Sequence, residues 1–466
     1  MIHPFKLNGY NIILDVNSGS IHNVDDVAYD VICLYENTPK EEIEAVIQKR
    51  YPEVTPEDLQ DIFDDIETLK QQNKLFTEDP FEDMAIDFKK RQSVIKALCL
   101  HVAHDCNLRC AYCFAGEGEY KGERSLMSYE VGKRAFDFLI ENSGTRKNLE
   151  VDFFGGEPLM NFEVVKKLVA YGREQEKLHN KNFRFTITTN GVLLTDDVMD
   201  FCNKEMSNVV LSMDGRPEVN DRLRKTRNGG GSYELIVPRF LEMARRRGQK
   251  DYYMRGTYTH YNTDFSNDIL HMADLGFKEL SMEPVVASPT DPYALREEDL
   301  PTLLNEYEKL AVEMIRRRRN GNGFNFYHYS IDLMGGPCIV KRISGCGVGT
   351  EYMAVTPCGD LYPCHQFVGE PRFLLGNVFT GVTNKEVCDE FKLCNVYAHK
   401  ECKDCFARLY CSGGCAANAY HTTGSVTGVY TMGCELHKKR IECAIMMKVA
   451  EACDANSFAE SEMPLV

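Results

Sequence analysis

The sequence predicts an α/β fold in three parts: a partial (β/α)6 barrel, a winged-helix-like domain before it and a cysteine-rich domain after it. Strand-like and helix-like segments alternate from about 95 to 320, and 13 of the 19 cysteines lie between 320 and 455. The first 85 residues follow neither pattern. Alternating strands and helices favour parallel strands with right-handed crossovers. We therefore expect domains at 1–85, 95–320 and 325–455.

The N-terminal 85 residues are expected to fold separately. Period-two alternation and helical periodicity predict a strand, a turn, a second strand and two helices, at 11–16, 17–20, 21–26, 40–50 and 56–72. A hairpin beside short helices is typical of winged-helix domains, many of which bind DNA. Residues 1–90, however, carry eight Lys and Arg against 20 Asp and Glu. So acidic a surface repels phosphate groups.

The middle region supplies six β/α units. Expected strands lie at 97–102, 149–154, 183–188, 208–213, 252–258 and 278–283. Expected helices lie at 128–142, 162–178, 196–204, 233–248, 265–275 and 300–318. Reactive groups of β/α barrels gather on loops at the carboxyl ends of the strands. Polar motifs follow all six expected strands, and the last is Glu283-Pro284, so the sequence predicts one site over the barrel mouth.

Composition limits the possible partners and compartment. A formal net charge of −16 argues against nucleic acid as a partner. The start of the chain has no apolar signal region, and no run approaches the ~18 apolar residues of a membrane span. We therefore expect a cytoplasmic protein without a membrane partner. Nineteen cysteines in such a protein indicate metal or redox chemistry rather than disulfides. The basic run at 316–319 is expected to be a solvated helix end.

A short cysteine motif follows the first expected strand. Cys106, Cys110 and Cys113 form a C-x3-C-x2-C run, with Tyr112 before the last cysteine. Structural zinc uses four ligands, and nearby histidines keep a zinc site open as an alternative. A [4Fe–4S] cluster held by three cysteines leaves one iron open to a small molecule. The run resembles that of radical S-adenosylmethionine (SAM) enzymes, which implies that SAM chelates the open iron.

That resemblance also implies which side chains bind SAM. Gly155, Gly156 and Glu157 resemble the GGE motif of the superfamily, in which the glycines permit close approach and the carboxylate pairs with the methionine ammonium. Further contacts to ribose and carboxylate are implied for Thr189, Asn190, Ser212, Asp214, Arg224 and Arg255. Ordinary turn and cap roles are the alternative for these polar residues.

The C-terminal cysteines follow a second pattern, in a region with little apolar periodicity that we expect to fold largely around metal. Their spacing is similar to the SPASM extension of radical SAM enzymes, which carries two auxiliary [4Fe–4S] clusters. The resemblance assigns an outer cysteine set to a fully ligated cluster: Cys402, Cys405, Cys411 and Cys434. It assigns an inner cysteine set to a second cluster: Cys346, Cys364 and Cys415. Cys338 is a candidate fourth ligand of the inner set, and an open iron that binds a substrate thiolate is the other option. Paired zinc ribbons are the alternative. The other cysteines are expected to lie in the core.

Taken whole, the chain resembles maturases of SCIFF peptides (six cysteines in forty-five residues). These SPASM enzymes form thioether cross-links in a ribosomally synthesised, cysteine-rich precursor. The resemblance implies SAM, three [4Fe–4S] clusters, a ferredoxin- or flavodoxin-type electron donor and capture of the precursor's leader by strand addition to residues 1–85. The main alternative is an anaerobic sulfatase maturase, which forms formylglycine. The weaker alternative is a non-catalytic zinc-binding adaptor.

Overall fold

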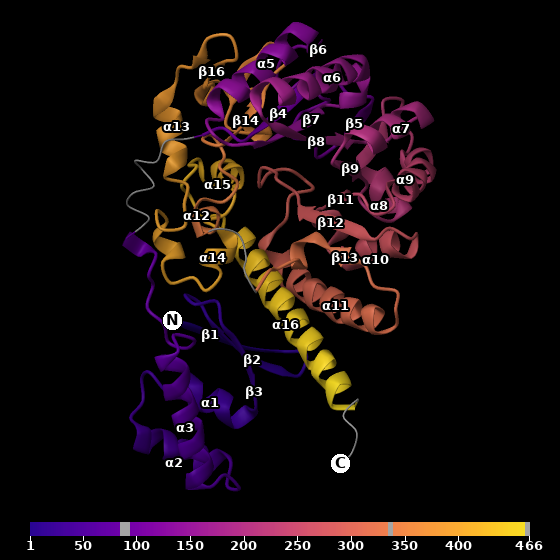
Figure 1. The fold of residues 1–466 in the computed structure, drawn as a ribbon. Helices are drawn as coiled ribbons and strands as arrows, with labels where there is room; N and C mark the ends of the chain where they lie inside the picture. The colour runs from indigo at the N-terminus through magenta and orange to yellow at the C-terminus, as the bar shows by residue number, and fades with distance from the viewer. Residues whose placement is uncertain (84–93, 334–338, 462–466) are drawn as a thin grey trace.

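The computed structural model describes residues 1–83, 94–333 and 339–461. Figure 1 shows the N-terminal domain (indigo) below the barrel (magenta to orange), with the cysteine-rich region (orange) along one side. The long C-terminal helix α16 (Thr431–Ser461) runs beside α11 (Leu300–Arg319) and between the domains. The three regions therefore meet around one helix.

The barrel contains the six parallel strands that the sequence predicts. Along the sheet their order is β12-β11-β9-β8-β7-β4, and all neighbouring pairs are parallel. They span Ala97–His104 (β4), Asn148–Gly155 (β7), Asn182–Thr189 (β8), Asn208–Ser212 (β9), Tyr252–Tyr258 (β11) and Glu279–Pro284 (β12). The predicted fold class is confirmed, and all six carboxyl ends open on the same side.

Helices cover the outer face of this sheet. They are α5 (Tyr129–Asn142), α6 (Phe162–His179), α7 (Asp196–Glu205), α8 (Pro217–Leu223), α9 (Tyr233–Arg247), α10 (Ser266–Asp274) and α11. Every second side chain of β7 is buried under them, as with Leu149, Val151 and Phe153, while Glu150 and Asp152 alternate with these on the other face. The helix α5 begins where the Ser128 hydroxyl accepts a hydrogen bond from the Val131 N–H at 3.2 Å. The burial pattern of β7 and the N-terminal cap of α5 thus agree with the predicted β/α units.

The cysteine-rich region extends the barrel sheet, which the sequence did not predict. Its strand β14 (Tyr352–Val355) pairs in parallel with β4, and the sheet continues through β15 (Asp360–Tyr362), β16 (Gly376–Asn377) and β17 (Gly381–Val382). Leu361, Phe367 and Phe373 are buried in the same apolar core as the barrel. The expectation of a region folded largely by metal is therefore wrong for this half of it.

The N-terminal domain has its own apolar core, which includes Ile13, Ile43 and Phe63. It contains a three-stranded antiparallel sheet and three helices: β1 (Ile2–Leu7), β2 (Tyr10–Asp15), β3 (Ile21–Val24), α1 (Asp26–Leu34), α2 (Lys40–Arg50) and α3 (Pro56–Gln71). The sequence patterns did not predict β1 and α1. The predicted second strand ends early because the Asp25 carboxylate caps α1, accepting a hydrogen bond from the Ala28 N–H at 2.8 Å.

Several side-chain contacts join the domains to one another, among them the following two. The ring of His3 stacks on Phe406 at a centroid distance of 3.5 Å, which joins β1 to the loop of the outer cysteine set. The basic run at the end of α11 pairs with acidic groups instead of being only solvated, and Arg319 bonds Asp454 of α16 at 2.8 Å. Although α16 is 31 residues long, no helix within 1–83, 94–333 and 339–461 is long and apolar enough to cross a membrane.

Candidate active site

The cysteine loop is held at the mouth of the barrel by a small sheet of its own. The strand β5 (Leu108–Cys110) pairs antiparallel with β10 (Arg224–Thr226), so that Cys110 lies opposite Arg224. The Arg227 Nε donates a 2.7 Å hydrogen bond to the backbone oxygen of Cys106, and its guanidinium also bonds Asp105. These contacts fix the backbone that carries the first two cysteines.

The structure brings the three predicted thiols together. Burial, with smaller contributions from neighbouring thiols and carboxylates, raises the pKa of Cys106 and of Cys110 to about 12 against the opposing charge of Arg224. Burial likewise raises the pKa of Cys113. Metals bind cysteine as thiolate, so three clustered, desolvated thiols beside an arginine suit a metal that removes their protons. A donor set of three sulfurs fits an iron–sulfur cluster with one open iron better than closed tetrahedral zinc.

The glycines of the GGE segment allow a close backbone contact that the sequence did not predict. A Cβ on Gly155 would lie 2.2 Å from the Ala103 oxygen, and a Cβ on Gly156 would lie 2.2 Å from the Asp105 oxygen. The Gly156 N–H donates to that Ala103 oxygen at 2.8 Å. The glycines thus let the end of β7 lie directly against the cysteine loop, and this contact places Glu157 beneath it.

Glu157 is buried and bound by groups at the end of β8. Its carboxylate accepts hydrogen bonds from the Leu159 N–H at 3.1 Å, the Thr189 hydroxyl at 2.8 Å and the Asn190 N–H at 2.8 Å. Burial nevertheless raises the pKa of Glu157 to about 7, against the lowering effect of these bonds. A carboxylate offers about four lone-pair positions, so one remains for a ligand ammonium.

Asn190 joins β8 to the cysteine loop. Its Nδ2 donates to the Asn107 Oδ1 at 2.7 Å and lies 3.6 Å from the Cys106 sulfur. The Thr189 hydroxyl accepts a 3.0 Å bond from the Gly191 N–H while it donates to Glu157. Both predicted residues therefore contribute to holding the loop, which is the alternative role that the sequence left open for them.

Tyr112, Asp214 and Arg224 form a buried triad beside Cys110. The Tyr112 hydroxyl donates to the Asp214 carboxylate at 2.7 Å and accepts a 2.7 Å bond from Arg224, whose guanidinium lies 3.8 Å from Asp214. Burial raises the pKa of Asp214 against the opposing charge of Arg224. The Arg224 Nε is buried without a hydrogen-bond partner among the described residues. An orphaned guanidinium nitrogen beside the thiols fits an anionic ligand group.

Among the described residues, neither Ser212 nor Arg255 has a side-chain hydrogen bond to that triad, although the Thr257 N–H of β11 donates to the Asp214 carboxylate at 3.0 Å. Ser212 and Arg255 sit opposite one another on β9 and β11, and Arg255 is exposed. The charge of Arg255 acts on Glu283, at the end of β12, and on His365, next to Cys364. The two arginines that the sequence grouped together therefore face different surroundings.

The C-terminal cysteines separate into the two predicted sets. Burial raises the pKa of Cys402 to about 11 and that of Cys411 to about 12, and the other thiols of the outer set add to both shifts. In the inner set, burial raises the pKa of Cys415, with Cys346 among the contributing neighbours. Cys338 lies outside the described residues. Each set is thus a group of adjacent thiols, as metal ligation requires.

Cys394 is a neighbour of the inner set that sequence reasoning assigned to the core. Burial raises its pKa to about 12, and the thiols of Cys346 and Cys415 contribute. Its thiol donates to the Val426 oxygen at 3.4 Å. Its distance along the chain from the inner set matches no ligand spacing, so only the fold reveals this proximity.

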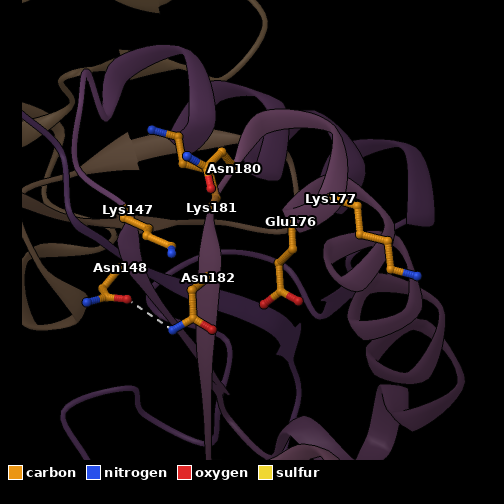
Figure 2. A pocket seen from close by; sticks show the side chains of 7 residues that line it. All are labelled: Lys147, Asn148, Glu176, Lys177, Asn180, Lys181 and Asn182. Atoms are coloured by element: carbon orange, nitrogen blue, oxygen red, sulfur yellow. Dashed lines mark hydrogen bonds between the residues drawn. The ribbon is translucent and has the colours of Figure 1, made fainter.

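A surface pocket lies at the opposite end of the barrel (Figure 2). Its lining comes from the β7 and β8 starts and the α6 end: Lys147, Asn148, Glu176, Lys177, Asn180, Lys181 and Asn182. Asn148 and Asn182 begin their strands and are joined by a 3.0 Å hydrogen bond. In β/α barrels this amino-terminal face serves stability, and the cysteines lie at the other end.

Comparisons with known proteins agree with this geometry. Residues 100–275 match the Radical SAM superfamily, and residues 346–406 match the SPASM iron-sulfur cluster-binding domain. The first span covers the cysteine loop, and the second runs from Cys346 to the residue after Cys405.

Two curated relatives match most of the chain. The radical SAM cyclopropyl synthase TigE of Paramaledivibacter caminithermalis is 22% identical over 360 residues, covering 74% of this chain and 72% of that protein. The cysteine-type anaerobic sulfatase-maturating enzyme of Clostridium novyi is 26% identical over 339 residues, covering 67% of this chain and 86% of that enzyme.

A solved structure matches nearly the whole fold. The crystal structure of Streptococcus suis SuiB bound to precursor peptide SuiA has a TM-score of 0.52 at 17% identity, covering 93% of this chain and 98% of that one. The solved structure shows the likeness of fold, and the family models place a Radical SAM superfamily domain at 100–275 and a SPASM domain at 346–406. The radical SAM domain implies SAM and a [4Fe–4S] cluster.

Proposed function

We propose that this enzyme forms thioether cross-links in a ribosomally synthesised, SCIFF-type precursor peptide. Each cross-link replaces one S–H and one C–H bond of the peptide by a C–S bond. The proposal rests on one observation: the same chain contains two C-terminal cysteine sets and an N-terminal domain with an unpaired sheet edge. The second feature suits peptide capture, and the first suits redox chemistry on a bound peptide.

The N-terminal domain supports recognition of a peptide. Its sheet has the order β1-β2-β3, and no strand in the described parts of the chain pairs with the outer edge of β3. An exposed edge accepts an extended peptide through main-chain hydrogen bonds. The acidic surface of the domain favours a leader with basic side chains. Its winged-helix character remains part of the proposal.

The coverage of the known proteins favours a peptide maturase over a sulfatase maturase. The Clostridium novyi enzyme aligns in sequence with 67% of this chain, whereas SuiB, which was crystallised with a precursor peptide, superposes in structure on 93% of it. SuiB matches a larger share of this chain, as we expect if both proteins have an N-terminal peptide-binding region. Formylglycine formation therefore stays the second candidate.

The residues at the barrel mouth have defined tasks in this proposal. Cys106, Cys110 and Cys113 would hold a [4Fe–4S] cluster which, with SAM bound, would supply the radical chemistry that removes a hydrogen atom from the substrate. Glu157 binds the methionine ammonium, and Arg224 offers its unpartnered Nε to the methionine carboxylate. Thr189, Asn190, Asp214 and Tyr112 keep these two groups in place through the hydrogen bonds described above.

The C-terminal cysteines are proposed to hold two auxiliary [4Fe–4S] clusters, which makes three in all. The outer set offers four thiols, enough to close a cluster. The inner set offers three, with Cys338 as the candidate fourth ligand. These sites would carry away the electron released when the C–S bond forms, with a ferredoxin- or flavodoxin-type protein as the external donor for SAM cleavage.

Product analysis tests the proposal. A cysteine-rich precursor peptide is incubated anaerobically with the reconstituted enzyme, SAM and a reductant, then alkylated and fragmented. A thioether lowers the mass by about 2 Da, the mass of two hydrogen atoms, and removes one alkylatable cysteine. An aldehyde on a former cysteine would instead assign the enzyme to formylglycine formation.

Hydrogen exchange tests the peptide-capture step separately. The leader segment should slow exchange of the amides at 21–24 on the β3 edge, because added main-chain hydrogen bonds protect that edge. Amides in β1 serve as the internal control, since β1 lies at the opposite edge of the sheet. Equal protection of both strands, or of neither, would contradict strand addition at β3.

A further inference from the structure

Two hydrogen-bond donors converge on the sulfur atom of Cys106. The Leu108 N–H donates to this sulfur at 3.4 Å, and the Asn190 Nδ2 donates to it at 3.6 Å. Within 1–83, 94–333 and 339–461, no other cysteine of the three sets accepts a hydrogen bond from a side-chain amide. A thiol is a weak acceptor, and hydrogen bonds strengthen when the acceptor is ionised. The surroundings of Cys106 therefore suit a negatively charged sulfur.

The amide group of Asn190 is held in one orientation. Its Oδ1 accepts a 3.1 Å hydrogen bond from the Val192 N–H, so the Nδ2 faces the cysteine loop. Because this nitrogen carries two hydrogens, it serves the Cys106 sulfur and also donates to the Asn107 Oδ1 at 2.7 Å. The side chain is buried, and its backbone N–H donates to Glu157 at 2.8 Å. Both N–H groups of the side chain are thus committed to the cysteine loop.

Asn107 adds a second amide donor to this loop. Its Oδ1 accepts from Asn190 and lies 3.9 Å from the Cys106 sulfur. Its Nδ2 is buried and has no hydrogen-bond partner among the described residues. A buried polar group without a partner calls for an explanation, and the sulfur atoms of an iron–sulfur cluster accept hydrogen bonds. The orphaned donor therefore fits a cluster on the first cysteine set: Cys106, Cys110 and Cys113.

We propose that the side-chain amides of Asn190 and Asn107 donate hydrogen bonds to the sulfur atoms of this first cluster and raise its reduction potential. Asn190 acts on the Cys106 sulfur, and Asn107 acts on a sulfide of the cluster. Reduction adds one electron from the external donor, and the two amides stabilise the added negative charge. No proton is transferred, and no covalent bond forms or breaks.

This inference concerns a property of the first cluster that the thioether reaction does not determine. It rests on the proposed function only in placing a [4Fe–4S] cluster on the first cysteine set. It also changes the role of Asn190, for which the family resemblance implied a contact to the ribose or carboxylate of SAM. Because both N–H groups of its side chain are committed to the loop, Asn190 is assigned to the cluster instead.

An EPR-monitored redox titration of the anaerobically reconstituted full-length protein tests the assignment. The potential is measured without SAM, and the first cluster is recognised by the change of its signal when SAM is added. Asn190→Leu removes the amide but keeps a neutral side chain and the backbone N–H that binds Glu157. The equilibrium constant for one-electron reduction should fall about tenfold, which is ~59 mV toward lower potential. Asn107→Leu should shift the potential in the same direction.

Isotope labelling supplies a readout that a purely structural role would not change. The protein is produced with asparagine that carries ¹⁵N in its side chain, and the reduced first cluster is studied by pulsed EPR. A ¹⁵N coupling should be present in the unsubstituted protein, and it should disappear when Asn190→Leu is combined with Asn107→Leu. A coupling that is absent from the unsubstituted protein, or that persists in the double variant, would overturn the proposal even if a variant loses iron.

Matched controls separate the outcomes. Asn182 begins β8, whereas Asn190 directly follows it, and Asn182→Leu at the opposite end of the barrel should change neither the potential nor the coupling (Figure 2). With equal iron per chain, an unchanged potential in Asn190→Leu would overturn the assignment. A tenfold loss of SAM affinity at unchanged potential would also overturn it, and would return Asn190 to a SAM contact. Protein that binds no iron on the first cysteine set would refute the cluster itself, and with it the proposed function.

Discussion

The cysteine loop of the barrel and the outer cysteine set differ in what holds them. Around Cys106, side chains from several strand ends bond one another, as Glu157 does with Thr189. In the loop of the outer set, a buried charge belongs to Arg408, which lies between Cys405 and Cys411 in the sequence. Its guanidinium bonds Asn17 and lies 3.0 Å from Asp79, both in the N-terminal region. The first site is thus built within the barrel domain, from the ends of its strands and the small β5–β10 sheet, and the second by contacts between domains.

Because of this difference, we expect damage to the first site to reduce activity and damage to the outer set to reduce stability. The barrel mouth keeps its shape through hydrogen bonds within the sheet, so losing the metal should abolish chemistry and leave the fold. The outer set lies in a region of turns and short helices, where metal ligation and the docked N-terminal domain support each other. Damage there should first appear as lost stability.

Substituting a cysteine of the first site should eliminate activity without unfolding the protein. Cys110→Ala should reduce SAM cleavage by at least about 10³-fold and lower the iron content by about four per chain, because two thiols do not hold the cluster. Its melting temperature should change by only a few degrees. Cys33→Ala, which removes an exposed cysteine of the N-terminal domain, is the matched control. Retained SAM cleavage in Cys110→Ala would refute the assignment.

Substituting Arg408 should lower stability rather than the affinity for SAM. Arg408→Gln leaves the Asp79 carboxylate without its buried partner, and breaking a buried pair costs about 3 kcal/mol. Thermal unfolding should therefore begin several degrees lower, with loss of iron from the outer set. Arg372→Gln breaks a surface pair and should cost less than about 1 kcal/mol. Equal melting temperatures for the two variants would contradict the contrast between the sites.

The ionisation of Glu157 should make SAM binding depend on pH. Its pKa of about 7 means that the carboxyl is mostly protonated at pH 6 and ionised at pH 8. Only the ionised form pairs with the methionine ammonium, so SAM affinity should rise about tenfold over that range. Glu157→Gln should bind more weakly and show no such rise. Glu150→Gln, an exposed position on the same strand, should keep it. A rise that persists in Glu157→Gln would assign the ionisation to another group.

The barrel could be predicted from the sequence because local patterns determine it. Alternation in segments such as 149–154 fixes which side chains are buried, and parallel strands bring their carboxyl ends together whatever the details of the loops. The C-terminal half was harder to predict. Its strand β14 pairs with β4, which lies more than 240 residues away in the sequence, and no local pattern reveals that partner. α16 mixes charged and apolar residues, because it contacts α11, β1 and β2 in turn.

The site could be predicted only at the level of residue types. The spacing of Cys106, Cys110 and Cys113 correctly predicted that they share one loop. Two other details of the site could be recognised only from three-dimensional contacts. The glycines of the GGE segment are required by the backbone of Ala103 and Asp105. Arg255 and Arg224 looked equivalent in sequence, yet their strand positions give them different neighbours. The neighbours of a strand residue depend on the strand register, and the register depends on pairing between segments that are distant in the sequence.

Metal analysis of the anaerobically purified protein is the most direct test of the central claim that three cysteine sets hold iron–sulfur clusters. The account predicts brown protein with about twelve irons per chain, falling to about eight in Cys110→Ala and also in Cys411→Ala. Two or three zinc ions per chain, in colourless protein, would contradict it.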